Sequence, residues 1–145
     1  MSMKATPDSQ EEPANYGLPT TFRYALSDWQ LLADFAEDAP GAEQITDYKA
    51  LGKAFWLRVE GDAMTAPSGL SISAGMSVLV DTGVEAQVGR LVIARVPGNP
   101  LGILRQLVVE GGQRFLKPLN PTYPITLCGD DCELLGVAIQ AGIRF

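Results

Sequence analysis

The sequence predicts a mainly β domain built from curved, partly barrel-like antiparallel sheets with little helix. Short apolar stretches recur at regular spacing, turns rich in Gly, Pro and Asn separate them, and few stretches follow helical spacing. This pattern is typical of β-barrels and related all-β architectures. The 145 residues are 46% hydrophobic and 19% charged, which is the composition of a globular domain with a core of its own.

The first 21 residues differ in composition from the rest of the chain. Pro7, Pro13 and Pro19 stand among Ser, Glu, Asp and Asn, with few apolar residues. We therefore expect a flexible linker or N-terminal arm over 1–21 and one domain over 22–145. A helix-turn-helix DNA-binding domain needs several amphipathic helices, for which 1–21 leaves no room. The chain is then expected to be either a stand-alone protein or the C-terminal half of a longer one.

The stretch 22–53 is expected to form an arm and a loop ahead of the main strands. Over 22–37, Leu26, Trp29 and Ala36 are among apolar residues that recur at helical spacing, but an extended arm is equally compatible with the pattern. Both alternatives stay open. Residues 37–53 are polar and marked by Gly and Pro, which predicts a surface loop.

The central stretch is 55–67, which reads FWLRVEGDAMTAP. It opens as a strand, with apolar Phe55 and Leu57 alternating with larger or charged side chains at a period of two. The alternation stops at Gly61, and a short turn or helix start is expected there. A bend of this kind presents its next side chain and its backbone N–H groups outward. The residue at this bend is Ala63.

The remaining strands follow from the turn signals downstream. PGNP at 97–100 and Gly-Gly at 111–112 predict hairpin turns, and the Pro-bounded stretch 120–124 predicts a corner. Strands are expected at 76–81, 91–96, 102–109, 113–119 and 133–143.

Charge and hydropathy exclude several function classes. Eleven Lys plus Arg against seventeen Asp plus Glu give a net charge of −6, and no basic run is present, so we expect no direct nucleic-acid binding by this chain. No apolar run approaches the roughly 18 residues of a membrane span, and the N-terminus lacks the pattern of a signal peptide. We expect a cytoplasmic protein without a membrane partner and without a cofactor.

The two cysteines, Cys128 and Cys132, lie in a CGDDC turn, and the chain has no histidine. Two thiols without an imidazole do not complete a zinc site, although Asp130 or Asp131 could join in principle. A disulfide requires that the turn permit its geometry. We expect reduced cysteines in the turn.

Several of these stretches together resemble the self-cleaving repressor peptidases, namely LexA, the lambda-type phage repressors and UmuD. The motifs are FWLRVEGDAMTAPSG (55–69), GMSVLVD (75–81), LVIARV (91–96), FLKPLNPTYP (115–124) and CELLGVAIQA (132–141). They follow the family order over roughly the last two-thirds of the chain, which makes the match specific. The resemblance implies the fold of a LexA-like C-terminal domain, in agreement with the pattern of strands.

The resemblance also implies a Ser–Lys catalytic pair, and this chain carries neither residue. The family places its serine nucleophile where Ala63 stands, and its buried, neutral lysine base where Arg105 stands. Alanine has no hydroxyl, and arginine stays protonated in proteins. When Trp29 is aligned with the family's tryptophan, the scissile Ala-Gly pair of the family falls on Leu32 and Ala33.

Other residues are not expected to replace the missing pair. Lys117 follows a predicted strand beside a proline turn, and Lys53 precedes the central strand; lysines in such places are usually solvated. The serines within 68–77 lie in a loop or strand rather than at the bend, and loop serines are turn formers first.

The alanine at the nucleophile position has two explanations, and each implies a different function. Natural loss of activity predicts changes at the nucleophile, the base and the cleavage site together, as this sequence shows, whereas an engineered change explains position 63 alone. We therefore expect a catalytically inactive, peptidase-like dimerisation and regulatory domain of a phage-repressor-type transcriptional regulator, in SOS or prophage control. The alternative is a self-cleaving Ser–Lys peptidase disabled by an engineered Ser-to-Ala change. A third class, a ligand-binding β module that reuses the cleft, has no support in the sequence.

The expected partners follow from the last strand and from the family. The stretch 134–145 carries one charge, Arg144, and a core strand would bury only alternate side chains. We therefore expect a homodimer whose interface includes Leu134–Phe145. The resemblance adds the RecA filament and an intact repressor as candidate partners.

Overall fold

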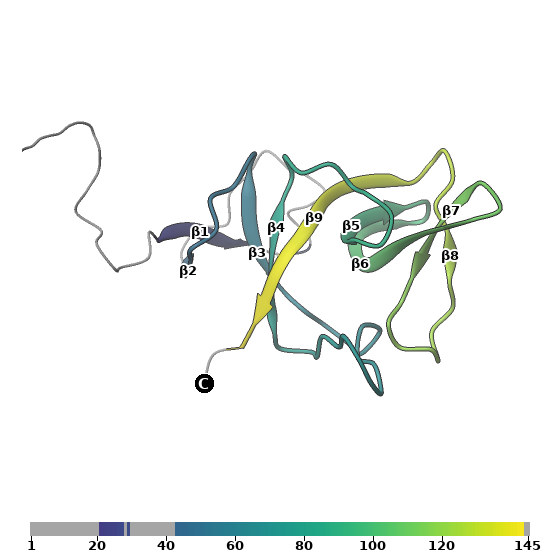
Figure 1. The fold of residues 1–145 in the computed structure, drawn as a ribbon, viewed down its shortest axis with the longest axis horizontal. Helices are drawn as coiled ribbons and strands as arrows, with labels where there is room; N and C mark the ends of the chain where they lie inside the picture. The colour runs from purple at the N-terminus through teal and green to yellow at the C-terminus, as the bar shows by residue number, and fades with distance from the viewer. Residues whose placement is uncertain (1–20, 28, 30–42, 144–145) are drawn as a thin grey trace, which may run out of the picture.

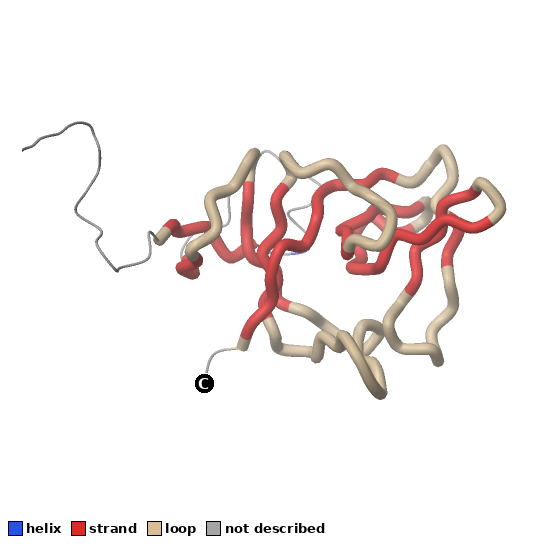
Figure 2. Tube along the Cα trace, viewed as in Figure 1, coloured by secondary structure: helices blue, strands red, loops and turns tan. Residues whose placement is uncertain are grey.

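The described part of the chain forms a single mixed β-sheet of nine strands (Figure 1). The computed structural model describes residues 21–27, 29 and 43–143. The strands are β1 (Phe22–Ser27), β2 (Glu43–Thr46), β3 (Ala54–Arg58), β4 (Ser77–Asp81), β5 (Leu91–Val96), β6 (Asn99–Glu110), β7 (Gln113–Lys117), β8 (Thr126–Leu127) and β9 (Glu133–Gly142). Figure 2 shows strands joined by loops throughout, which confirms the mainly β prediction.

The order across the sheet is β2-β1-β3-β4-β9-β5-β6-β7-β8. The sheet does not close, because β2 and β8 lie at its opposite ends. The last strand, β9, crosses the middle of the molecule and pairs antiparallel with both β4 and β5 (Figure 1). Only β1 and β3 pair in parallel among the described strands, with Leu26 opposite Trp56.

The structure describes part of the arm expected over 22–37 and contains a strand within the loop expected over 37–53. Residues 22–27 are extended as β1, whereas the rest of the expected helix or arm, 30–37, lies outside the described residues. The prediction of a loop over 37–53 is wrong at β2, which pairs with β1. This short strand is fixed by distant contacts: Thr46 is buried and donates from Oγ1 to Gln140 on β9 (2.5 Å), and Trp56 donates to the carbonyl of Gln44 (3.2 Å).

Most predicted strands are found with small shifts at their ends. The prediction over 91–96 matches β5, and β4, β7 and β9 lie inside their predicted ranges. The turn predicted over 97–100 is too long, because Val96 already pairs with Asn99. Gly98 has a positive φ of 82°, which glycine adopts without a steric cost, and this permits the tight two-residue turn.

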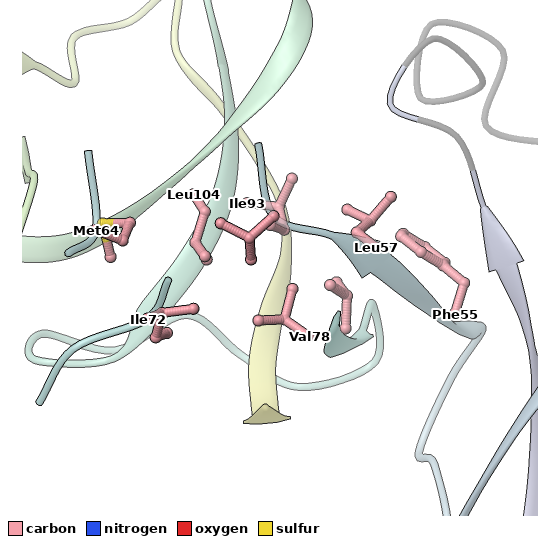
Figure 3. Packing of buried hydrophobic residues seen from close by; sticks show 9 residues of the cluster. Phe55, Leu57, Met64, Ile72, Val78, Ile93 and Leu104 are labelled. Carbon is pink, nitrogen blue, oxygen red and sulfur yellow. The ribbon is translucent and has the colours of Figure 1, made fainter. Parts of the chain in front are cut away.

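Two apolar clusters lie along the sheet. The first joins β3 and β4 to the segment after β3, and Figure 3 shows Phe55, Leu57, Met64, Ile72, Val78, Ile93 and Leu104 gathered in it. The second lies around β5, β6, β7 and the middle of β9. On β5, Ile93 belongs to the first cluster, while Val92 and Ala94 belong to the second, as the alternation of a strand requires.

The expectation of reduced cysteines is wrong for this structure. Cys128 and Cys132 form a disulfide, with their Cα atoms 5.2 Å apart. The intervening turn folds back on itself because the N–H of Cys132 donates to the carbonyl of Gly129 (3.1 Å). The turn thus supplies the separation that a disulfide needs.

Candidate functional site

The bend after β3 is the centre of the candidate site. Gly61 has a positive φ of 75°, and the N–H of Thr65 donates to the carbonyl of Asp62 (3.0 Å), so the chain turns sharply around Ala63. The next side chain, Met64, is buried in the first cluster, and its carbonyl accepts the N–H of Ile72 (2.8 Å). The bend is therefore held to the core on one side of Ala63.

The corner after β7 supports the other side of the bend. The backbone N–H of Asn120 donates to the carbonyl of Ala63 (2.9 Å), and its side-chain amide donates to the carbonyl of Asp62 (3.0 Å). The hydroxyl of Tyr123 donates to the Asp62 carboxylate (2.5 Å). This hydrogen bond raises the pKa of Tyr123. Sequence reasoning identified the corner but not this role, although Asn in a Pro-bounded turn is a signal of side-chain capping.

Ala63 and Arg105 line the same cleft, which has a volume of about 250 Å³. The bend forms one wall and β6 forms another, with Trp29 and Tyr123 also lining the space. The structure thus brings together the two residues that the sequence placed at the nucleophile and base positions, although they lie far apart in the chain.

Arg105 is a half-buried cation in this cleft. Its Nη1 donates to the carbonyl of Leu104 (2.8 Å), whereas its Nε is buried and has no hydrogen-bond partner among the described residues. Burial lowers the pKa of the guanidinium, and Tyr123 opposes this shift. Because arginine has the highest pKa of the side chains, the group stays charged and cannot accept a proton from a nucleophile.

Comparison with known proteins identifies the family. The Peptidase S24-like family matches residues 29–139, which include the bend and the residues that line the cleft. The chain belongs to the Peptidase S24-like family. This confirms the resemblance to the C-terminal domains of LexA and the phage repressors.

Related proteins are repressors and transcriptional regulators by name. Repressor protein C2 of Salmonella phage P22 is 48% identical over 88 residues, which cover 61% of this chain and 41% of that protein. The HTH-type transcriptional regulators for conjugative element R391 of Providencia rettgeri and for conjugative element SXT of Vibrio cholerae are each 42% identical over 121 residues, or 81% of this chain and 56% of theirs. The chain spans about half the length of the curated relatives it matches.

Trp29 places the start of the S24-like domain beside the cleft. Its indole N–H donates to the carbonyl of Arg58 at the end of β3 (2.7 Å), and its ring packs against the first cluster. The predicted cleavage-site positions, Leu32 and Ala33, lie outside the described residues. Their register therefore stays a prediction.

None of the other candidate groups lines the cleft within the described ranges. Lys53, Lys117 and the serines of 68–77 all lie elsewhere. Ser71 accepts the N–H of Ala66 (2.9 Å), as expected of a turn-forming serine, and Ser77 donates to the side chain of Gln44 (3.1 Å). The described ranges also contain no group of three or more His, Cys, Asp or Glu arranged for a metal ion, and no helix there is long and apolar enough to span a membrane.

Proposed function

We propose that this chain is the regulatory domain of a repressor-type transcriptional regulator, and that it pairs subunits without cleaving itself. Membership of the S24-like family and the similarity to named repressors and HTH-type regulators support the regulatory part. The net charge of −6 disfavours direct contact between this chain and the DNA backbone, so we propose that another segment or protein contacts DNA.

The observation that carries the loss of cleavage is the pairing of Ala63 with Arg105 in one cleft. A Ser–Lys peptidase needs a hydroxyl at the bend and a base that burial keeps neutral. Ala63 supplies no nucleophile. The guanidinium of Arg105 supplies no base, because the burial that would neutralise a lysine leaves an arginine charged.

An engineered Ser-to-Ala change in an active peptidase is the alternative. The intact bend, braced by Asn120 and Tyr123, favours it, since a nucleophile position would need this support. Arg105 counts against it, because a single engineered change leaves the base in place. The coding sequence at position 63 separates the two, since a serine codon there would make the alanine an engineered change.

A cleavage assay tests the proposal directly. We expect Ala63→Ser alone to stay intact for lack of a base, and Ala63→Ser with Arg105→Lys to stay intact because Leu32 and Ala33 fit poorly where alanine and glycine belong. Adding Leu32→Ala and Ala33→Gly should yield two fragments on a gel, faster at alkaline pH as the introduced lysine deprotonates.

The matched control carries Arg105→Lys, Leu32→Ala and Ala33→Gly but keeps Ala63, and it should never cleave. Efficient cutting by Ala63→Ser alone would overturn the loss of activity and favour the engineered alternative.

The pairing of subunits is supported by the free edge of β9. Its first half, up to Val137, pairs with β5, and the residues from Val137 onward pair with β4, so after Val137 one edge of β9 has no partner among the described strands. The backbone groups on the other edge are available to a second strand. We propose a homodimer in which the second halves of two β9 strands meet.

Further partners belong to the same proposal. A dimerising S24-like domain could pair with an intact repressor, or it could contact a RecA filament in SOS or prophage control. Its site of action is proposed to be the cytoplasm, where transcriptional regulators meet DNA.

A further inference from the structure

The cleft beside Ala63 combines one arginine and two carboxylates with apolar residues. Arg105 stands at one side, and Val59, Met64, Leu101 and Leu104 line the rest together with the bend. The Nε of Arg105 is buried without a hydrogen-bond partner among the described residues. Because that atom is out of contact with solvent, a ligand in the cleft would pair with the other N–H groups of the guanidinium, since Arg105 as a whole is only partly buried.

We propose that this cleft binds the C-terminal carboxylate of a peptide, with the guanidinium of Arg105 pairing the carboxylate and the apolar walls receiving the last side chain. This inference rests on the proposed loss of cleavage, because a cleft without nucleophile or base can hold a peptide end without reacting with it. The planar guanidinium matches a carboxylate in a two-pronged arrangement that a lysine would not provide.

The charges around the cleft favour a carboxylate over a phosphate. Glu60 and Asp62 also line the space, and the whole chain carries a net charge of −6. A phosphate with nearly two negative charges is repelled more strongly by these carboxylates than a single carboxylate is. The apolar walls favour a ligand with a side chain next to its charge rather than a bare anion.

The size of the cleft limits the ligand to the end of a peptide. Its volume of about 250 Å³ lies just below the range of roughly 300–1,000 Å³ for pockets that enclose drug-sized molecules. One or two terminal residues would fill it. The remainder of the peptide would then lie outside the cleft.

Calorimetry on the full 145-residue protein tests the proposal with N-acetyl-Ala-Ala-Leu as the probe. We expect the free acid to bind at least about tenfold more tightly than the same peptide with a C-terminal amide, since a charge-assisted pair is lost in the amide. N-acetyl-Ala-Ala-Glu amide tests whether the cleft prefers a side-chain carboxylate, and inorganic phosphate tests whether it prefers a phosphate. Equal binding of acid and amide, or tighter binding of either of these two probes, would overturn the proposal.

Substitutions locate the site. Arg105→Gln should abolish the preference for the acid, and Arg105→Lys should weaken it by removing the planar fork. The matched control is Arg114→Gln, on the exposed side of β7, which should bind as the unchanged protein does. An equal loss of the preference for the acid in Arg114→Gln would show that binding depends on overall charge, and it would overturn the assignment of the site to the cleft.

Nuclear magnetic resonance of the unchanged protein gives a readout that does not depend on a variant folding. The guanidinium N–H resonance of Arg105 should shift when the acid is added and should stay in place with the amide. An unmoved resonance at saturating acid would overturn the inference while leaving the dimer and the loss of cleavage intact. Self-cleavage by Ala63→Ser alone would instead overturn the proposed function.

Discussion

Asp81, at the end of β4, accepts four hydrogen bonds, three of which hold a distant segment of the chain in place. Its fully buried carboxylate accepts the hydroxyl of Tyr48 (2.6 Å) and the backbone N–H groups of Leu51 (2.7 Å), Gly52 (3.0 Å) and Gly83 (2.8 Å). Burial raises the pKa of Asp81, but these hydrogen bonds outweigh it and hold the pKa below its ordinary value. Burial and the bond to Asp81 also raise the pKa of Tyr48 to about 12.

Replacing this carboxylate should destabilise the fold. In Asp81→Asn an amide NH₂ takes the place of one acceptor oxygen and faces donors, so we expect the free energy of unfolding at pH 7 to fall by about 3 kcal/mol. Urea denaturation followed by tryptophan fluorescence measures it. Glu110→Gln, on the exposed end of β6, is the matched control and should change stability by less than about 0.5 kcal/mol.

The pKa of Asp81 also predicts how stability depends on pH. Because the folded pKa is lowered, the unfolded chain binds more protons between the two pKa values, so the contribution of Asp81 is present above about pH 4 and is lost as the pH falls through the folded value. The unchanged protein should therefore lose stability below pH 4 more steeply than Asp81→Asn. Parallel curves for the two proteins would contradict this role.

At the scale of residues, the sequence predicts positions inside a local motif better than partners across the fold. Ala63 could be placed at a bend because the strand alternation stops two residues before it. Tyr123 and its hydrogen bond to Asp62 join residues 61 positions apart, and Tyr48 and Asp81 are 33 apart. Such pairs depend on which strands become neighbours, which no local pattern reports.

Among the elements, the turn that links β8 to β9 carries the disulfide between Cys128 and Cys132. A bond that closes so short a loop restricts the unfolded chain modestly, so we expect reduction by dithiothreitol to lower the free energy of unfolding by about 2 kcal/mol. Cys132→Ser should have this lower stability with and without reductant. Equal stability of the oxidised and reduced protein, with thiol alkylation confirming both states, would contradict the prediction.

The redox conditions of the compartment decide whether Cys128 and Cys132 are bonded or reduced. A reducing cytoplasm keeps most thiols unbonded, so the bond and the proposed cytoplasmic site of action are in tension. The buried position of Cys128 in the second cluster does not depend on the bond, since a thiol packs there as a small apolar group.

The strands show where the sequence predicts elements and where it does not. From β4 onward, Gly and Pro turns separate the strands, and the predicted strands were found within a few residues, whereas the two-residue strand β8 was not predicted. The hairpin of β1 and β2 was missed as a unit, because Glu43–Thr46 is too short for a periodic signal and gains its stability from contacts with Trp56 and Gln140. The same hairpin explains why Trp56 is buried although the alternation of β3 placed it opposite the core.

At the scale of the whole molecule, the open sheet leaves strand edges that a second copy can cover. The last three residues of β9, 140–142, are exposed, belong to a strand in the middle of the sheet, and lead to Ile143, which is 57% exposed. An internal strand with one free edge is unusual because proteins normally protect such edges. This feature argues that the protein is completed by association.

The dimer predicts a mass near twice 15.5 kDa in sedimentation equilibrium at micromolar concentration. Ala141→Lys places a charge on the exposed second half of β9, where two antiparallel copies would bring the lysines near each other, so it should shift the mass to that of the monomer. Val109→Lys is the matched control, since Val109 is an exposed side chain on β6 (45%) far from this edge, and it should leave the dimer intact. A monomeric unchanged protein would reject the dimer. An Ala141→Lys protein that stays dimeric would show that the interface lies elsewhere, and the edge strand β8 at the end of the sheet would be tested next.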